Sequence, residues 1–541
     1  MGRWGPLAIL AAAQFVMVLD QAVMNVSISQ LVVDLDTNVT AIQAVITLYS
    51  LVMAMLMITG GKIGDLIGRR RAFIVGLGIY AVGSSVTAIA PNVVVLAVGW
   101  SLLEGIGAAL VLPALAALIA GNYVGRDRAV AYSVIGGVAG AGIAVGPILG
   151  GWATTELSWR VVFVGEVVVV LVILVFIRAL RDVPSDAGRP RLDVVGGLLS
   201  AAGLGLVVLA VLRAGTWGWV VPNNSPVEPF GFALTPFVAG AGGVLLWAFA
   251  TWQRVRERRD TDPLIHLDLL RIRPLRAGLQ TFLAQNLILM GVFFTIPLYL
   301  QLVLGLDALE TGLRMLPVSV LMFLASVAGA RLAARYPSRT LVRAGLVSVM
   351  VATLALLATI EPTLAEWRFA ASMGLLGLGL GLVASQLGNV VQSSVDASGR
   401  SEAGGLQYTA QQLGAALGVA LVGAIVLSGL VGNFLVKIDE DPAVPAAVTA
   451  QAELAVSGQV SFVTAEQVRS SATEAGVEED VVEALVHAYE QAQLFALKAG
   501  LLVCVVLSLV ALLATKGLPS RLEPSSDVAL RTDTGSDPAP G

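Results

Sequence analysis

Apolar segments of about 20 residues recur along the whole chain, and a helix of that length can cross the hydrocarbon layer of a bilayer. Hydrophobic residues make up 57% of the 541 residues and charged residues only 13%, which is too few charges for an ordinary soluble protein. A soluble core could not bury this much apolar surface. The sequence therefore predicts an all-α polytopic membrane protein.

The apolar segments favour helices over the strands of a membrane β-barrel. Barrel strands are about 10 residues long and alternate in polarity, whereas residues 164–177 (VGEVVVVLVILVFI) are apolar on both faces. We predict fourteen transmembrane helices, arranged as six, two and six. The predicted spans are 7–33, 42–62, 72–90, 93–121, 129–155, 160–180, 193–213, 231–252, 277–304, 308–334, 338–360, 367–393, 402–431 and 494–516.

The positions of lysine and arginine indicate which ends of the spans face the cytoplasm. Cytoplasmic loops carry most of these residues in membrane proteins. If the N-terminus is inside, the great majority of the 33 Lys and Arg fall at cytoplasmic ends, and acidic residues gather in the outer connections. An even number of spans then puts both termini in the cytoplasm. We expect a multi-pass protein of a bacterial inner membrane.

The spans divide the chain into three membrane blocks and a tail. We predict an N-terminal six-helix bundle (1–181), an inserted helix pair 7–8 with a cytoplasmic linker (182–276), and a C-terminal six-helix bundle (277–516). The last block includes an outer segment, 432–493, in which TAEQ and VEEDVVEALVHAYEQAQ predict capped helices that lead into span 14. Residues 517–541 are predicted to form a disordered cytoplasmic tail.

Few side chains could carry enzymatic or metal chemistry. Cys504 is the only cysteine and lies in an apolar stretch, which favours a small core residue over a reactive thiol. The two histidines, His266 and His487, lie in polar connections. We therefore expect no enzyme, no metal site and no cofactor. The net charge of −4 gives no reason to expect a nucleic acid as a partner.

A glycine- and arginine-rich stretch, GKIGDLIGRRR (61–71), separates spans 2 and 3. Its glycines remove side chains where two helices turn back, and its arginines hold that turn in the cytoplasm. Its carboxylate can pair with an arginine or with a facing helix end, in a contact that forms in one arrangement and breaks in another. The alternative is a topological anchor only. The candidate gate residues are Gly61, Gly64, Asp65, Gly68, Arg69, Arg70 and Arg71.

This stretch closely resembles the helix 2–3 loop signature of the major facilitator superfamily, with Ile63 and Leu66 in place of the usual Leu and Arg. LDQAVMNVSIS (19–29) is similar to the helix 1 signature of its fourteen-helix drug:proton antiporter branch. PLYLQLVLGLDALETGLRMLP and GLQYTAQQLGAALGVALVG in the second half are similar to that branch as well. GIAVGPILGG in span 5 resembles the antiporter motif of exporting members, through Gly142, Gly146, Pro147, Gly150 and Gly151.

The resemblance implies the major facilitator fold and a rocker-switch exporter with a central cavity, driven by protons that move inward. It implies that Asp65 and its arginines form the inner gate contact. It also implies that the antiporter motif packs span 5 on a helix of the other half and seals the cytoplasmic side. Small residues allow such a close approach, and Pro147 bends the helix.

Departures from the family pattern leave unpaired acids in the first block. Span 4 has Ser101 and Glu104 where the family usually has Arg and Gln, and span 6 has Glu166 where it usually has Asn. Together with Asp20 in span 1, this gives three carboxyl groups at membrane depth without a Lys or Arg at comparable depth. A charged carboxylate is costly in hydrocarbon, so we expect these acids to rest protonated and to carry protons.

An acid of this kind can couple two fluxes. A cationic ligand beside it would favour ionisation and release the proton, and protonation would in turn expel the cation. We expect amphipathic, cationic drugs or toxic compounds to be exported by alternating access. Glu166 could instead only form hydrogen bonds at the outer edge of its helix. Further cavity candidates, some of which could only join helices, are Asn25, Tyr49, Trp100, Gln285, Asn286, Gln386, Asn389, Gln407 and Gln411.

Two alternative functions stay open. A dedicated exporter of one antibiotic, siderophore or lipid on the same fold would show a narrow substrate range. A non-transporting receptor or a channel would be indifferent to a pH gradient. In each case we expect a monomer in the lipid bilayer, with a small-molecule substrate and protons as the partners of the exporters.

Overall fold

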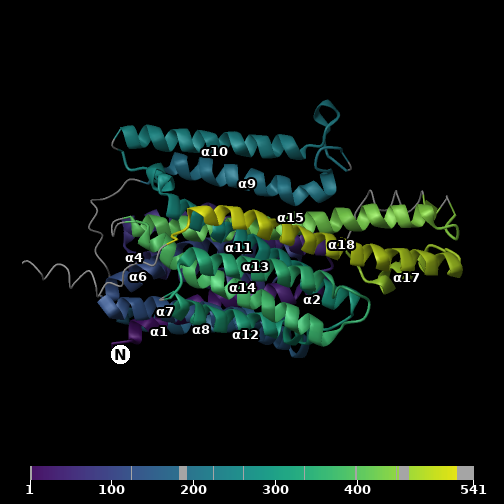
Figure 1. The fold of residues 1–541 in the computed structure, drawn as a ribbon, viewed down its shortest axis with the longest axis horizontal. Coiled ribbons are helices and arrows are strands. Elements are labelled where there is room, and N and C mark those ends of the chain that lie inside the picture. The colour runs from purple at the N-terminus through teal and green to yellow at the C-terminus, as the bar shows by residue number, and fades with distance from the viewer. Residues whose placement is uncertain are drawn as a thin grey trace, which may run out of the picture.

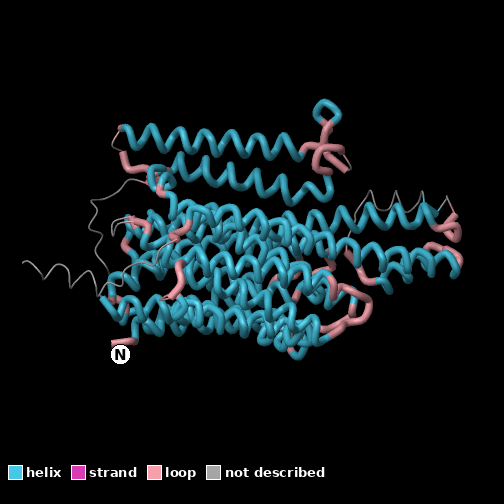
Figure 2. Tube along the Cα trace, viewed as in Figure 1, coloured by secondary structure: helices cyan, strands magenta, loops and turns pink. Residues whose placement is uncertain are grey.

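The computed structural model describes residues 3–123, 125–181, 192–222, 224–259, 261–333, 335–395, 399–445, 448–449 and 462–520. Within these ranges the chain consists of helices joined by loops, and Figure 2 shows this arrangement. Among the described residues, fourteen helices are long and apolar enough to cross a membrane. The predicted fold class is confirmed. Residues 182–191 of the predicted linker, 450–461 of the outer segment and 521–541 of the tail lie outside the described residues.

The N-terminal bundle holds the first six spans. Span 1 is broken at Ser27, whose hydroxyl donates to the Val23 carbonyl at 2.9 Å, so that a short second helix follows the first. Span 4 contains a π-helical segment. The elements are α1 (Gly5–Val26), α2 (Ile28–Asp34), α3 (Val39–Ile67), α4 (Arg69–Ala88), α5 (Val93–Leu96), the π-helix η1 (Ala97–Glu104), α6 (Gly105–Asn122), α7 (Gly125–Glu156) and α8 (Trp159–Phe176).

The C-terminal bundle holds the last six spans, and its first span also ends in a π-helical segment. Its elements are α11 (Arg273–Leu298), the π-helix η5 (Tyr299–Val303), α12 (Ala308–Leu332), α13 (Ser338–Leu357), α14 (Glu366–Ser393), α15 (Arg400–Glu440) and α18 (Glu479–Ala514). The two bundles meet along α3 with α15 and along α7 with α12.

The inserted pair, α9 (Val194–Trp217) and α10 (Thr235–Arg258), lies along one edge of the molecule, at the top of Figure 1. α9 packs against α3 and α15, so it contacts both bundles, whereas α10 packs mainly on α9. Asp193 caps the start of α9 by accepting hydrogen bonds from the Gly196 N–H, the Trp252 indole and the Gln253 amide. Burial would raise the pKa of Asp193, but these hydrogen bonds and the nearby Arg256 guanidinium lower it below its ordinary value.

The outer segment extends beyond the spans. α15 and α18 project past the other helices together with α17 (Ala465–Glu474), at the right of Figure 1. A small apolar core that includes Ile438, Val481 and Leu485 holds these helix ends together. Thr464 begins α17 with the capping box that TAEQ predicts, and the second predicted helix runs without a break into span 14.

Candidate functional site

Three acids from three different helices meet inside the N-terminal bundle. Asp20 comes from α1, Glu104 from the end of η1 and Glu166 from α8. Their exposed fractions are 0%, 0% and 2%, and one carboxylate oxygen of each lies within 4.8 Å of the other two. The sequence predicted each acid as a site residue, and the structure brings all three together. Glu166 therefore lies in this acid cluster.

Hydrogen-bond donors hold one oxygen of each acid in place. The Trp100 indole donates to Asp20 Oδ1 at 2.7 Å, and the Thr87 hydroxyl donates to Glu104 Oε1 at 3.1 Å. The hydroxyls of Tyr80 and Ser84 both donate to Glu166 Oε2 at 3.2 Å. Tyr80, Ser84 and Thr87 all belong to α4, so this helix supplies donors to two of the acids.

The second oxygen of each acid has no hydrogen-bond partner among the described residues. No ion pair in the described part of the chain involves Asp20, Glu104 or Glu166 either. Polar groups that are buried without partners are costly and are expected to bind protons, water or a ligand. The acid cluster can therefore accept a proton or a cationic group.

Close helix packing fixes the geometry of the acid cluster. A Cβ at Gly83 of α4 would collide with Glu104 and with the Gly99 carbonyl, so only glycine allows α4 and η1 to approach this closely. η1 also carries Trp100, whose ring stacks on Tyr49 of α3 with centroids 4.4 Å apart. π-helical segments often occur at functional sites. Here the segment brings Trp100 and Glu104 to the same buried cluster.

The donors on α4 were missed in the sequence analysis. Tyr80, Ser84 and Thr87 are four and three residues apart, which places them on one face of a helix. That spacing is a usable signal, because three hydroxyls on one face of a membrane helix need partners within the bundle.

Most of the predicted cavity residues in the second half do not join the acid cluster. Gln285 donates its amide to the Leu380 carbonyl at 3.1 Å, and Gln386 donates to the Gly329 carbonyl at 2.9 Å, so both connect helices within the C-terminal bundle. Asn25 and Asn286 donate to carbonyls of their own helices. Asn389 is exposed, and Gln407 and Gln411 are half-buried on α15.

The predicted gate residues lie at the junction of α3 and α4. Gly68 joins the two helices with φ 95°, a left-handed conformation that favours glycine. Asp65 forms an ion pair with Arg69 one turn further along. Gly61 faces Pro113 of α6, and Gly64 faces Arg69 and Ala72. Arg70 and Arg71 follow in the first turn of α4.

The antiporter motif packs α7 against two helices. Gly142, Gly146 and Gly150 face α1, whereas Pro147 and Gly151 face α12 of the other bundle. This α12 contact includes the hydrogen bond from the Leu309 N–H to the Thr155 hydroxyl at 3.2 Å. On the predicted orientation the contact lies at the outer end of α7. The motif thus packs span 5 on a helix of the other half. On that orientation the contact joins the outer ends of the two helices, whereas the resemblance implied a seal on the cytoplasmic side.

Two glutamines outside the predicted site also join the bundles at this outer side. Gln301 of η5 donates to the Val26 carbonyl at 2.8 Å and accepts from the Ser29 N–H at 3.2 Å, so it binds both sides of the α1–α2 break. Gln43 of α3 donates to the Val419 carbonyl of α15 at 3.0 Å. The outer ends of the two bundles are thus held together.

Comparisons with known proteins agree with this architecture. The profile of the Major Facilitator Superfamily matches residues 10–419. The chain is 30% identical to the "Probable actinorhodin transporter" of Streptomyces coelicolor, over 84% of this chain and 77% of that protein. It is 30% identical to the "Multidrug efflux pump LfrA" of Mycolicibacterium smegmatis, over 78% of this chain and 80% of that protein.

Solved structures share the fold. A bacterial homologue of the human lysosomal transporter Spinster, in an inward-facing and unoccupied conformation, aligns with a TM-score of 0.61 at 14% identity, over 97% of this chain and 99% of that chain. Family and fold indicate a membrane transporter and not an enzyme. With a matching profile over most of its length and fourteen apolar helices, the chain belongs to the Major Facilitator Superfamily.

Proposed function

We propose that this protein is a proton-coupled efflux antiporter that exports amphipathic, cationic drugs or toxic compounds by alternating access. It would act as a monomer in a bacterial inner membrane with both termini in the cytoplasm. The observation that carries the proposal is the convergence of Asp20, Glu104 and Glu166 in a buried cluster with no ion-pair partner in the described part of the chain. A relative that is named as a multidrug efflux pump supports the outward direction of transport.

Mutual repulsion explains why such a cluster would hold protons. Two ionised carboxylates 4.8 Å apart repel each other by about 3 kcal/mol at an effective dielectric constant of about 20. A third acid within the same distance adds two more repulsive pairs, and the described residues supply no cation to offset them. Protons therefore neutralise most of the cluster at rest, and a cationic substrate close to it would displace a proton.

Transport by purified protein in proteoliposomes tests this proposal. With ethidium as the probe, uptake against a gradient should require an imposed pH gradient and should collapse when a protonophore is added. Asp20→Asn should abolish the coupled uptake, and Glu104→Gln and Glu166→Gln should reduce it. Glu366→Gln is the matched control, because Glu366 is an exposed acid on α14 whose ion-pair partner among the described residues is Arg314. It should transport like the unmodified protein.

Ethidium accumulation that persists without a pH gradient, or in Asp20→Asn, would contradict proton coupling. Folding of each variant is checked by its thermal unfolding midpoint. A panel of chemically unrelated compounds separates a multidrug exporter from a dedicated one, because a dedicated exporter would transport a single member of the panel.

A further inference from the structure

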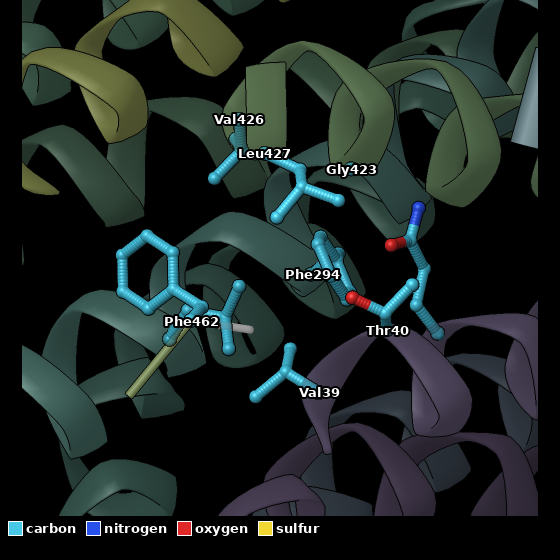
Figure 3. Close-up of a pocket in the computed structure, with 9 residues that line it drawn as sticks. Val39, Thr40, Phe294, Gly423, Val426, Leu427 and Phe462 are labelled. Atoms are coloured by element: carbon cyan, nitrogen blue, oxygen red, sulfur yellow. The ribbon is translucent and has the colours of Figure 1, made fainter. Parts of the chain in front are cut away.

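A small pocket lies between the two bundles near their outer ends. Its walls come from α3 of one bundle and from α11 and α15 of the other, as Figure 3 shows. The described residues that line the pocket carry no charge, and their polar groups are those of Thr40 and Gln43. The apolar wall is formed by Val39, Phe294, Leu298, Val426 and Leu427, with Gly423 beside them.

One wall residue comes from outside the spans. Phe462 belongs to the outer segment just before α17, yet its side chain is only 4% exposed and packs with the main apolar core. In the view of Figure 3 it lies on the opposite side of the pocket from Thr40. An aromatic side chain from the outer segment therefore completes a pocket whose other walls belong to both bundles.

Hydrogen bonds from α18 hold this aromatic residue in place. The Val463 N–H donates to the Tyr489 hydroxyl at 2.9 Å, and that hydroxyl in turn donates to the Val463 carbonyl at 3.2 Å. The Gln493 amide donates to the same carbonyl at 2.6 Å. We call residues 462–464 the outer strap. It is anchored to α18 at its middle residue, with Phe462 on the pocket side and the α17 cap, Thr464, on the other.

We propose that this pocket is an exit site for the apolar or aromatic face of the transported molecule, and that Phe462 occupies its outer side until the molecule leaves. The inference rests on the proposed export function. The two bundles meet along α3 with α15 and along α7 with α12, and the pocket lies at the first of these contacts, which must loosen if the bundles separate there. An uncharged wall would bind the apolar face of an amphipathic cation while its charged group stays in water.

Cysteine labelling from outside tests the position of Phe462 without measuring transport. In a Cys504→Ala background, Leu427→Cys places a thiol in the pocket, and a membrane-impermeant maleimide measures its accessibility. Leu427 is 7% exposed, so labelling should be slow. Truncation of a buried phenylalanine removes a large apolar contact, so Phe462→Ala should speed labelling by about tenfold or more. Tyr489→Phe, which removes the hydroxyl that binds Val463, should act in the same direction, and Phe462→Leu should restore slow labelling.

Val436→Cys is the matched control, because Val436 lies on the outer part of α15 and is already 53% exposed. Its labelling rate should not change with Phe462→Ala. Equal labelling of Leu427→Cys with and without Phe462 would overturn the proposal that Phe462 closes the pocket.

Ethidium then tests whether the opened pocket binds cargo. In Phe462→Ala, ethidium should slow the labelling of Leu427→Cys, and it should leave that of Val436→Cys unchanged. Ethidium that fails to protect Leu427→Cys would overturn the exit site. If the unmodified protein transported neither ethidium nor any other member of the compound panel, the export function would fail, whereas the effect of Phe462 on labelling would still be measurable.

Discussion

Removal of the Gln301 side chain should open the outer face of the protein. Gln301 is 5% exposed, and its amide makes two hydrogen bonds to the backbone at the α1–α2 break. Each hydrogen bond contributes about 0.5–1.5 kcal/mol net, so Gln301→Ala should destabilise the outward-closed arrangement by about 1–3 kcal/mol. That energy changes the ratio of closed to open molecules by about 5- to 150-fold.

Spin labels can measure this shift. Val33 on α2 and Thr363 before α14 are exposed positions on the outer sides of the two bundles, and cysteines placed there can carry the labels. Pulsed electron resonance should show a longer distance component that grows in Gln301→Ala. Gln285→Ala is the control, because among the described residues the Gln285 amide donates to the Leu380 carbonyl, which belongs to the same C-terminal bundle. Distance distributions that are the same in the unmodified protein and in Gln301→Ala would refute the assignment of Gln301 to outer closure.

Three further predictions concern packing and capping. Gly312→Ala adds a Cβ that collides with a backbone carbonyl of α7, so it should lengthen the same spin-label distance, whereas Gly78→Ala, which meets no atom within 4 Å, should not. Trp100→Ala removes a fully buried ring and should lower the free energy of unfolding by about 3–5 kcal/mol. Trp100→Phe loses chiefly the hydrogen bond to Asp20 and should lower the free energy of unfolding by about 1–3 kcal/mol. Thermal unfolding measures both changes. Asp193→Ala should speed amide hydrogen exchange at the start of α9 near pH 7. Because the pKa of Asp193 is lower in the folded than in the unfolded protein, Asp193 stabilises the fold above its unfolded pKa, and this stabilisation is lost as the pH falls below about 4. Below that pH the exchange rates of the variant and of the unmodified protein should become equal.

The spans could be read from the sequence because length and hydropathy decide whether a helix crosses a bilayer. Their outer continuation was harder to read. The helix over 477–493 and span 14 were predicted as separate elements, whereas the structure joins them in one helix, α18, which starts at Glu479, since residues 477–499 contain neither Pro nor Gly to break the helix. Span 1 was predicted as one helix, whereas the structure breaks it at Ser27, where the Ser27 hydroxyl meets the hydroxyl of Thr154, 127 residues away in the sequence.

The acid cluster was only partly predictable. The depth of Asp20, Glu104 and Glu166 follows from their positions within apolar runs. Helical periodicity gives the face on which a residue lies but not the helix that this face meets, so the approach of Glu166 to the other two acids could not be derived. The same limit applies to Gln285 and Gln386, whose carbonyl partners belong to neighbouring helices of the C-terminal bundle.

All three acids and the donors that hold them belong to the N-terminal bundle. A rocking motion of one bundle against the other leaves their mutual distances unchanged. Under the proposed function, proton coupling would then depend on the N-terminal bundle alone. Substitutions in the C-terminal bundle could change which substrates are recognised and leave proton coupling intact. Chimeras that exchange residues 277–516 between relatives should therefore exchange substrate selectivity and keep their coupling to the proton gradient.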